Sequence, residues 1–529
     1  MLFTSYGFIL FLAVLTLLYY VIPGKLQWML LLLGSYVFYA ICGLEYVPFL
    51  VAVTLIVYFG ARILDRKLTE QSDYLKENKG TLSKEEKKEY KAVQKKKRMV
   101  FQVIAVILCL LILALVKYVN FFIGNINSIF FASGEGLTFL KIAMPLGISF
   151  YTLQALSYLF DVSRGTIKAE KNVFKVALFV SFFPQLVQGP ISRFKDLSET
   201  LYSPHPFNKH AVAFGLQRIV WGFFKKLVIA DRMMPAVQTI FSDVNTYSGA
   251  YVLFGMLFYT VQLYADFTGG IDITIGVAEM LGIKVQENFN LPYFSTSLKE
   301  YWRRWHITMC NWFRDYIFYP VSSSKGMQKF SKFTRNHLGQ KAGRRIPVYI
   351  SSFVVWFMTG IWHGASWNFI VWGLANWAIL MISEEFEPLY EGFHKKLSFS
   401  NKLPYRIFQI LRTFALICVL NMFDVCKTIG ETVSAFFSIF SSQNWDKVSD
   451  GGLLDLGISV SDYIVLGVAV LIVLGVSLYK NKNGDIRNGI TKKAPAAKYA
   501  LWAVLVIVIL IFGTYGIGYD SSQFIYNQF

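Results

Sequence analysis

Long apolar runs, separated by short polar and basic segments, recur along the whole chain of 529 residues. Each run is close to the roughly 20 residues that a helix needs to cross the hydrocarbon core of a membrane. Because a segment in lipid must satisfy its own backbone hydrogen bonds, we expect these runs to be helices. The clearest are residues 5–22, 27–41, 46–63, 101–122, 461–479 and 501–518. The pattern predicts an all-α polytopic membrane protein.

The composition supports this interpretation. Charged residues make up 16% of the chain, against roughly a quarter in soluble domains, and the mean hydropathy is +0.45. The first run lacks a basic leader region and a small-residue cleavage site, so we expect an uncleaved span rather than a signal peptide. We expect one membrane-embedded domain over residues 1–529.

The basic residues gather in short segments between the apolar runs, and this pattern predicts an orientation. Lys and Arg outnumber Asp and Glu by 52 to 33. Residues 64–99 form a charged loop, expected to be helical, and residues 322–347 and 480–498 form basic loops. Positive charge is retained inside the cell, so we expect all three to be cytoplasmic and both termini to be outside. Residues 441–457 are polar and predict an external loop. No basic-aromatic binding module is visible, so we expect no nucleic-acid partner.

Two apolar runs are interrupted at positions that predict broken helices. Residues 183–190 contain two prolines and a glycine, and residues 268–270 read Thr-Gly-Gly. Breaks at membrane depth are tolerated where protein or a water-filled cavity covers the freed backbone groups. Together the breaks predict a central cavity. We find no internal repeat, so the sequence does not support an inverted-repeat transporter.

His363 lies in the run Thr-Gly-Ile-Trp-His-Gly at residues 359–364. A helix from Arg345 would place it roughly 27 Å along its axis, at about 1.5 Å per residue. An ionisable group at membrane depth is a functional candidate. Gly360 and Gly364 would allow a substrate or another helix to approach closely. A neutral imidazole there could take a proton from a hydroxyl group, or the histidine could bridge two helices.

A second histidine, His306, lies in residues 299–319, which we predict to be one helix. An aromatic stripe at helical spacing runs through Trp302, Trp305, His306, Met309, Trp312, Phe313 and Tyr316. The functional interpretation is a histidine aimed at a buried site, with Arg303, Arg304 and Arg314 facing anionic groups and Asp315 beside them. The alternative is an interfacial helix with a core histidine and arginines that snorkel or pair.

Asp266 and Asp272 are two further acids in an apolar stretch. They could cap a helix at the glycine break or bind substrate, and we favour the structural role. The two histidines lack a third ligand, so we predict no metal site. The five cysteines have no metal-ligand or disulfide spacing and are expected to be packing residues.

With these residues in view, the chain resembles the membrane-bound O-acyltransferase family. The resemblance is closest to its bacterial branch of alginate O-acetylation and D-alanyl transfer proteins, and within that branch to the alginate O-acetylation type. It rests on MPLGISFYT at 144–152, FPQLVQGPI at 183–191, ENFNLPY at 287–293, YWRRWHI at 301–307, WFRDY at 312–316 and TGIWHG at 359–364. Residues 512–526 resemble the C-terminal end of the alginate type.

The resemblance implies a ring of about ten or more transmembrane helices, some broken or re-entrant, around a thinned central catalytic funnel. His363 would be the catalytic histidine and His306 the second functional one. Trp305, Trp362, Asp266, Asp272, Asp315 and the three arginines would be substrate-binding candidates. The acyl donor would be acetyl-CoA or an acyl carrier protein thioester on the cytoplasmic side, with no cofactor bound.

The sequence departs from the family pattern at three places. Many relatives have a histidine soon after a Trp-Gly pair, but Trp372-Gly373 leads to Asn376, which cannot supply an imidazole. The family often reads Asp-Phe-Ser-Gly-Tyr-Ser-Asp where this chain has Thr268, Gly270 and Ile271. A late Phe-Arg pair is replaced by Phe423-Asp424.

These observations favour an O-acyltransferase that moves acetyl groups towards an extracytoplasmic polysaccharide. A secreted SGNH-type acyltransferase partner outside the bacterial cell membrane could carry the group onward. D-alanyl transfer to teichoic acid, a lipid acceptor, and a transporter or flippase without covalent chemistry are the alternatives.

Overall fold

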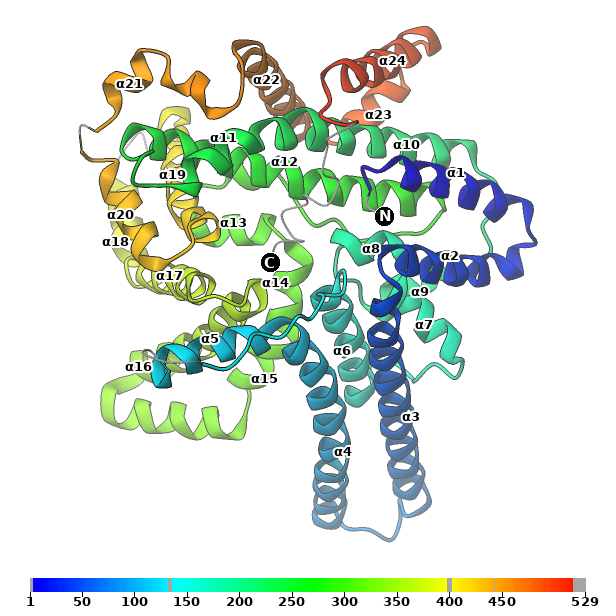
Figure 1. Cartoon of the computed structure of the whole chain (residues 1–529). Helices are drawn as coiled ribbons and strands as arrows, with labels where there is room; N and C mark the ends of the chain where they lie inside the picture. Colours follow the sequence, from blue (N-terminus) through cyan, green and yellow to red (C-terminus); the bar gives the residue numbers. More distant parts are fainter. Residues whose placement is uncertain (1–2, 132–135, 397–401, 442, 517–529) are drawn as a thin grey trace. The chain divides into compact units, whose positions relative to one another are not determined.

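The computed structural model describes residues 3–131, 136–396, 402–441 and 443–516. Every element within this part of the chain is helical, which confirms the all-α prediction (Figure 1). The helices group into two compact units, residues 1–215 with 277–286, and residues 216–276 with 287–529. Each unit is described on its own, and the single domain over 1–529 stays a prediction. The final part of the resemblance at 512–526, from residue 517 onward, lies outside the described residues.

Eight helical segments in the described part of the chain are long and apolar enough to cross a membrane, or nine if a pair bent by 49° counts as one span. This confirms a multi-pass membrane protein. The eight are Gly24–Cys42, Leu44–Glu77, Lys84–Phe130, Ala250–Met280, Lys325–His363, Leu403–Val425, Val460–Asn483 and Pro495–Phe512, and the bent pair is Trp367–Glu385 with Glu387–Lys395. A ring of ten or more spans around a funnel stays a prediction.

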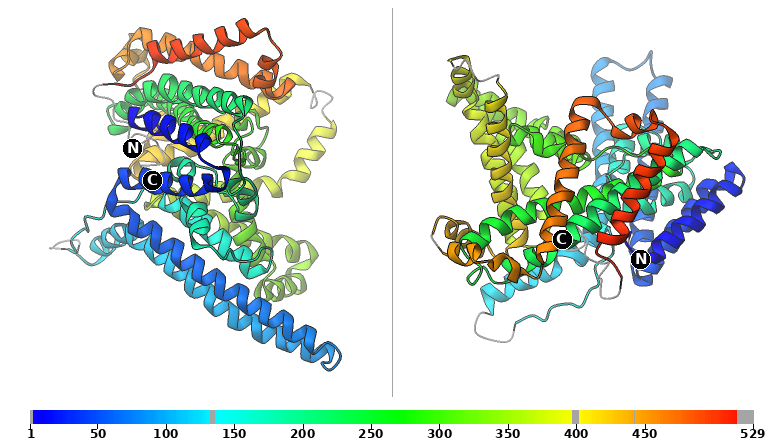
Figure 2. Two further views of the ribbon diagram at one scale, coloured as in Figure 1. Left: turned by 90° about the vertical axis from the view of Figure 1, so that its right-hand side faces the viewer. Right: turned by 90° about the horizontal axis from the view of Figure 1, so that it is seen from above.

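The first unit begins with the helices of the first apolar runs, of which Tyr6–Val21 is an apolar helix shorter than the eight spans. Its helices are α1 (Tyr6–Val21), α2 (Gln27–Cys42), α3 (Val47–Glu77), α4 (Lys84–Leu113), a π-helix (Ala114–Tyr118), α5 (Val119–Phe130), α6 (Ile148–Arg164), α7 (Val173–Ser181), α8 (Phe183–Gln188), α9 (Phe194–Leu201) and the start of α10 (Lys209–Phe223). Figure 2 shows α3 and α4 side by side as a long hairpin. The charged segment 64–99 forms its end and is helical, as predicted. Ser83 and Glu86 cap α4 reciprocally, with bonds of 3.1 and 2.7 Å, a capping box that starts the helix.

The predicted break at residues 183–190 is confirmed. Helix α7 ends at Ser181, α8 starts at Phe183 beside Pro184, and an extended segment follows from Gly189. Two buried glutamine side chains satisfy the freed carbonyls. Gln185 donates to the Pro190 carbonyl at 2.7 Å, and Gln154 donates to the Phe179 carbonyl at 2.6 Å. The break therefore persists because side chains replace the lost helical bonds.

The second unit contains the residues singled out for chemistry. After α10 come a π-helix (Phe224–Ala230), α11 (Asp231–Ser242), α12 (Ala250–Met280), α13 (Leu298–Arg304), α14 (Ile307–Phe313), a π-helix (Arg314–Phe318), α15 (Tyr319–Ser322), α16 (Lys325–His363), α17 (Trp367–Glu385), α18 (Glu387–Lys396), α19 (Leu403–Val425), α20 (Ile429–Ser438), α21 (Trp445–Ser449), α22 (Val460–Asn483), α23 (Ile486–Thr491) and α24 (Pro495–Phe512). Short 3₁₀ turns lie at Gly24–Leu26, Leu44–Tyr46, Pro292–Phe294 and Gly452–Leu456.

The basic segment 322–347, predicted to be a cytoplasmic loop, is largely helical, and its cytoplasmic placement stays a prediction. It forms the first arm of α16 and the start of the second arm, and the helix is interrupted between them at Gly339, where the backbone has φ 88°. Ser324 caps the start of the arm by accepting from the Met327 amide at 3.1 Å. Ser331 donates to the Gly343 carbonyl at 2.7 Å and ties the two arms together. These local bonds explain why the segment is helical despite its charge.

The other predicted loops keep more of their irregular character. Residues 441–457 hold only α21 and one 3₁₀ turn, and residue 442 lies outside the described residues. Residues 480–498 contain the end of α22, short α23 and the start of α24. Cytoplasmic or external placement of these segments stays a prediction.

Candidate active site

His363 is the last residue of α16. The chain from Gln340 to His363 is helical, so the predicted rise from Arg345 to this histidine holds. Gly360 faces α17 closely, because a Cβ there would lie 2.5 Å from the Phe369 carbonyl oxygen. Gly360 therefore allows another helix to approach closely, which is one of the two roles predicted for it. Helix α17 in turn places Trp372 edge-on to the imidazole of His363, with ring centroids 4.6 Å apart.

His306 does not lie within one long helix, so the predicted helix over 299–319 was wrong. Helix α13 ends at Arg304, and His306 has left-handed backbone angles, φ 47° and ψ 49°, before α14 starts. An extended segment bonds to this turn. The Asn290 amide donates to the Arg304 carbonyl at 2.9 Å, and the Ile307 amide donates to the Asn288 carbonyl at 3.0 Å. These long-range bonds stabilise a conformation that is uncommon for a residue other than glycine.

The predicted aromatic stripe is nevertheless buried, because both short helices turn the same side chains inward. His306 itself is 0% exposed, and His363 is 8% exposed. The other buried members are Trp302, Trp305, Met309, Trp312, Phe313 and Tyr316. The helix therefore breaks at His306, but the residues predicted to lie on its buried face are still buried.

Asn288 determines which nitrogen of His306 carries the proton in the neutral ring. Its side-chain oxygen accepts from the Thr308 backbone amide at 3.0 Å and from the Thr308 hydroxyl at 2.9 Å. A backbone amide can only donate, so this atom is an acceptor. The Nδ1 atom of His306 lies 3.3 Å from the same oxygen and therefore donates to it. Neutral His306 then carries its lone pair on Nε2.

The two histidines share one aromatic neighbour. The Trp362 indole lies 6.0 Å from the His306 ring and 5.1 Å from the His363 ring, measured between centroids. Both imidazoles therefore pack against the same indole ring. Phe267 lies 4.9 Å from His306 on another side. The structure therefore brings together His306, His363 and Trp362, three of the predicted site residues.

Asn376, which stands where many relatives have a histidine, has a structural role in the wall of this site. It is fully buried and accepts a bond of 3.0 Å from the Trp302 indole nitrogen. Its own amide donates to the Trp372 carbonyl at 2.9 Å. Trp302 packs edge-on against Trp372 at 5.6 Å. Asn376 thus fixes the tryptophan that stands beside Trp372, and Trp372 covers His363.

The three predicted arginines do not converge on the histidines. Arg303 is exposed on α13, and Arg304 pairs with Glu300 at 2.5 Å on the same helix. Arg314 pairs with Asp315 at 3.0 Å. Burial of Glu300 opposes its ionisation, but hydrogen bonds from Thr296 and the Arg304 charge outweigh that cost and lower the pKa of Glu300. These ion pairs give both arginines a local partner.

Trp305 is also a packing residue by position. Its ring stacks on Tyr301 at 5.6 Å and contacts Phe289 edge-on at 4.9 Å. Phe289 in turn contacts Phe267 at 4.9 Å. A continuous layer of aromatic rings therefore lies behind His306, and it holds the turn that carries this histidine.

Asp266 and Asp272 lie in ion pairs within an uninterrupted helix. Helix α12 runs through Thr268–Gly270, so the predicted break there, and capping at it, were wrong. Gly269 instead permits close packing, since a Cβ there would lie 2.9 Å from the Gly222 carbonyl oxygen. Lys226 bonds Asp266 and also Asp231, the latter at 2.8 Å, and all three side chains are buried.

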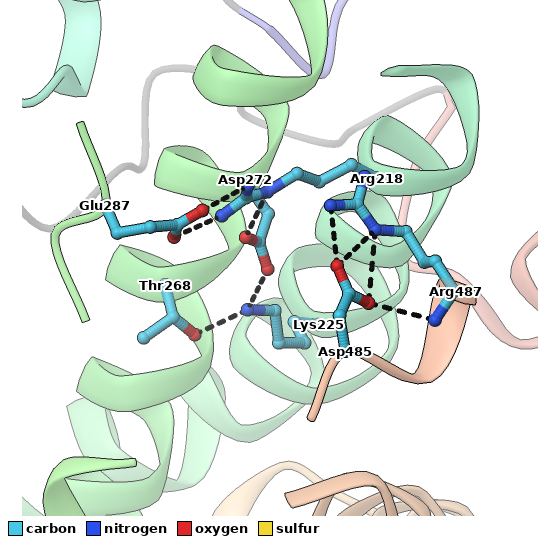
Figure 3. Close-up of polar contacts among 7 residues, drawn as sticks. All are labelled: Arg218, Lys225, Thr268, Asp272, Glu287, Asp485 and Arg487. Carbon is cyan, nitrogen blue, oxygen red and sulfur yellow. Dashed lines mark hydrogen bonds and ion pairs between the residues drawn. The ribbon is translucent and has the colours of Figure 1, made fainter. Parts of the chain in front are cut away.

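The pairs around Asp272 are drawn in Figure 3. Asp272 accepts from Lys225 at 2.6 Å and from Arg218 at 2.9 Å, and Lys225 also donates to Thr268 at 2.8 Å. Arg218 binds Glu287 through two bonds of 2.6 Å. Glu287 directly precedes Asn288, so this network anchors the segment that holds His306.

Asp485 and Arg487, which follow α22, lie beside this network in Figure 3 and pair at 2.9 Å. Burial of Asp485 opposes its ionisation, but hydrogen bonds from Arg487 outweigh it and hold the pKa of Asp485 below its usual range. The carboxylate therefore stays charged next to the cluster.

Sequence reasoning missed four residues that position the site: Asn288, Arg218, Lys225 and Lys226. The two lysines carried a visible signal, because they interrupt the apolar run 219–230 just as the two aspartates interrupt theirs. Opposite charges in two apolar runs predict a pair, since an unpaired buried charge is costly. Asn288 carried no such signal in a single sequence.

Comparison with known proteins identifies the family of this chain. The model of MBOAT, the membrane-bound O-acyltransferase family, matches residues 85–423, which include both histidines. The probable alginate O-acetylase AlgI of Azotobacter vinelandii is 35% identical over 377 residues, 70% of this chain and 66% of that protein. The aligned part thus falls just short of two thirds of that relative's length.

Two further relatives have different printed activities. The peptidoglycan O-acetyltransferase of Helicobacter pylori is 29% identical over 390 residues, 69% of this chain and 66% of that protein. The teichoic acid D-alanyltransferase of Bacillus subtilis is 28% identical over 281 residues, 52% of this chain and 66% of that protein. With both histidines inside the matched region and every element in the described part of the chain helical, the chain belongs to the membrane-bound O-acyltransferase family.

Proposed function

We propose that this protein is a membrane O-acyltransferase that moves an acetyl group from a cytoplasmic thioester to hydroxyl groups outside the cell. The observation that carries the proposal is the pairing of two buried histidines around one tryptophan at the end of a membrane-spanning helix. Two imidazoles packed against the same indole can hold and move a proton between reacting groups. The acceptor is a cell-surface polysaccharide, or a secreted SGNH-type partner that passes the acetyl group on.

In the proposed reaction, His363 accepts the proton of the acceptor hydroxyl while its oxygen attacks the thioester carbonyl carbon. The tetrahedral intermediate then collapses, the carbon–sulfur bond breaks, and the proton passes from His363 to the leaving sulfur. An O-acetyl ester and a free thiol result, so atoms and charge balance. No net change occurs in the enzyme, which fits general acid–base catalysis.

His306 has a role that follows from its hydrogen bond to Asn288. With Nδ1 engaged, only Nε2 remains for the substrate. In the neutral ring this atom accepts a hydrogen bond and can orient the acceptor hydroxyl. In the protonated ring it donates and can polarise the acyl carbonyl, the role that sequence analysis suggested. The nearby His363 disfavours two charges at once, so the two rings are expected to alternate.

The acyl donor is proposed to be acetyl-CoA or an acyl carrier protein thioester, reached from the cytoplasm. The basic segments 64–99, 322–347 and 480–498 support this side, because positive charge is retained there. Both termini then lie outside. Arg303, Arg304 and Arg314 stay candidates for donor phosphates, since arginine forks suit them, although the ion pairs of Arg304 and Arg314 would have to open.

Acetyl rather than D-alanyl transfer is supported by the comparisons. Identity to the alginate O-acetylase is 35% over 70% of this chain, against 28% over 52% for the D-alanyltransferase. Two alternatives, a transporter or flippase without covalent chemistry and an acyltransferase with a lipid acceptor, can be distinguished from this proposal by experiment.

The test compares surface acetylation in cells that carry wild-type protein, His363→Ala or His394→Ala. His394 is a matched control, because it bonds to Tyr405 on α19, far along the chain from the site motifs. We expect His363→Ala to abolish O-acetyl groups on surface glycan at unchanged membrane levels, and His394→Ala to leave them. Wild-type acetylation in His363→Ala would refute the assignment. Acetylated lipid in place of acetylated glycan would select a lipid acceptor.

A further inference from the structure

Two adjoining cavities lie beside α22, apart from the two histidines. The first has a volume of about 120 Å³ and is walled almost wholly by apolar side chains. Its apolar walls come from the π-helix before α11, from α12, from the segment after Phe289 and from α22. They include Ile229, Val261, Ala265, Phe294, Val470 and Leu474. This cavity suits hydrocarbon, because polar groups inside it would lose their hydrogen bonds to water.

The second cavity, of about 80 Å³, is lined by charged and apolar side chains in about equal measure. Part of its wall is the ion network of Figure 3, and its rim includes Trp221 and Lys480. Five residues line both cavities, which makes the two cavities neighbours: Lys225, Tyr264, Leu291, Val473 and Ser477. An apolar chamber and a charged chamber therefore share one wall.

Helix α22 gives the order of the two chambers. Its lining residues are Val470, Val473, Leu474, Val476, Ser477 and Lys480, which fall on one broad helical face. The ten steps from Val470 to Lys480 rise about 15 Å. Polarity increases along that face towards Lys480 and the basic segment that follows it. A ligand that fits both chambers is thus amphipathic, with its polar end at Lys480.

The charged side chains that line the second cavity favour a ligand whose polar end is anionic. Lys225 and Arg218 are already bonded to Asp272 and Glu287. Lys480 is exposed and makes no ion pair within the described part of the chain. The polar chamber therefore holds three cations against two carboxylates, and the cation left over stands at its rim, where a phosphate would meet it.

We propose that the two cavities bind an anionic membrane phospholipid, with its head group at Lys480 and the end of one acyl chain in the apolar chamber. A dry apolar cavity of about 150 Å³ holds a benzene ring, so 120 Å³ gives room for about four chain carbons. The rest of the chain would lie on the exposed apolar face of α22, where Leu471 is 66% exposed. A basic rim beside a membrane surface attracts anionic lipid.

The experiment measures lipid that remains bound after purification. Wild-type protein is reconstituted in mixed vesicles of phosphatidylglycerol and phosphatidylethanolamine, extracted in detergent, and bound lipid is counted by mass spectrometry. Val473→Trp fills the shared wall, and Val468→Trp, on the 54% exposed face of the same helix, is its control. We expect Val473→Trp to lower bound phosphatidylglycerol at least about tenfold, which corresponds to about 1.4 kcal/mol, and Val468→Trp to leave it.

Head-group choice is tested separately with surface variants that keep the fold. Lys480→Glu should shift bound lipid from phosphatidylglycerol to phosphatidylethanolamine, and Lys482→Glu, on the same helix end but outside the lining, should not. Equal lipid in wild type and Val473→Trp, or an unchanged preference in Lys480→Glu, would overturn the proposal. Displacement of the bound lipid by added acetyl-CoA would also overturn it and assign the chambers to the acyl donor.

Discussion

Asn288→Leu is the substitution that tests most sharply how His306 is positioned. Leucine has the same branched side-chain skeleton but accepts no hydrogen bond. Three donors would lose their common acceptor in a buried site: the Thr308 amide, the Thr308 hydroxyl and His306 Nδ1. A buried donor left without a partner costs about 1–3 kcal/mol. Because the three share one acceptor and can relax together, we expect a loss of stability on the order of 3 kcal/mol.

The effect on turnover follows from the tautomer of His306. Loss of a hydrogen bond worth about 1 kcal/mol changes the ratio of the two neutral tautomers by about fivefold. A general acid or base supplies about 10²-fold to 10⁴-fold in rate. We therefore expect kcat to fall by about 5-fold to 100-fold, with KM for the acyl donor little changed. The assay is acetyl transfer from radiolabelled acetyl-CoA by purified protein in vesicles.

Two variants separate positioning from simple damage. Asn290→Leu changes the same residue type two positions on, where the side chain is exposed and only the backbone bonds to Arg304. It should keep wild-type kcat. Asn288→Asp retains an acceptor for the same donors and should recover most of the kcat lost in Asn288→Leu. Wild-type kcat in Asn288→Leu, or an equal loss in Asn290→Leu, would refute the reasoning.

Three further predictions concern packing and charge. Gly373→Val should part α16 from α17 and lower acetyl transfer, because a Cβ there would lie 2.4 Å from the Trp356 carbonyl oxygen; Gly467→Val, with open space around it, should not change the transfer rate. Asp272→Asn should lower the free energy of unfolding by about 3–5 kcal/mol, as expected when a buried ion pair loses one partner, whereas Glu384→Gln in an exposed pair should cost about 1 kcal/mol or less, both read from thermal unfolding in detergent. Because the pKa of Glu300 is lowered in the folded protein, its carboxylate stabilises the fold fully above about pH 4.3, its usual pKa, and this stabilisation is lost as the pH falls through the lower folded pKa. Glu300→Gln should therefore weaken the dependence of the free energy of unfolding on pH at the acid side. An unchanged dependence would contradict the pairing with Arg304.

Much of the helical architecture could be predicted because membrane spans depend on a local property, the length of an apolar run. The run at 5–22 became α1, and the run at 461–479 lies within α22. The break at Pro184 was also predictable, because proline and glycine act on the backbone next to them. Such features need no information from distant residues.

The errors arose where distant residues determine the conformation. The helix expected over 299–319 breaks at His306 because residues 288–290 bond to that turn. Gly269 and Gly270 did not break α12, because Gly269 lies against another helix and the glycines are used for packing. Local propensity disfavours glycine in a helix by about 1 kcal/mol, which close packing can offset.

The two histidines of the candidate site could be chosen from the sequence, but the residues that position them could not. An imidazole at membrane depth is conspicuous in one sequence, so His363 and His306 could be chosen from position alone. The partners of Asp266 and Asp272 lie about 40 residues away, and Asn288 acts through one side-chain oxygen. Contacts of that kind depend on the folded chain.

The measurement that tests the central claim most directly is acceptor-dependent release of CoA from acetyl-CoA by purified protein in vesicles. The wild-type protein should release free thiol only when a polysaccharide acceptor or its carrier partner is present, and His363→Gln should release none, with unfolding temperature unchanged. Acceptor-dependent release at the wild-type rate by His363→Gln would contradict the account, because the proton of the hydroxyl would then have another acceptor.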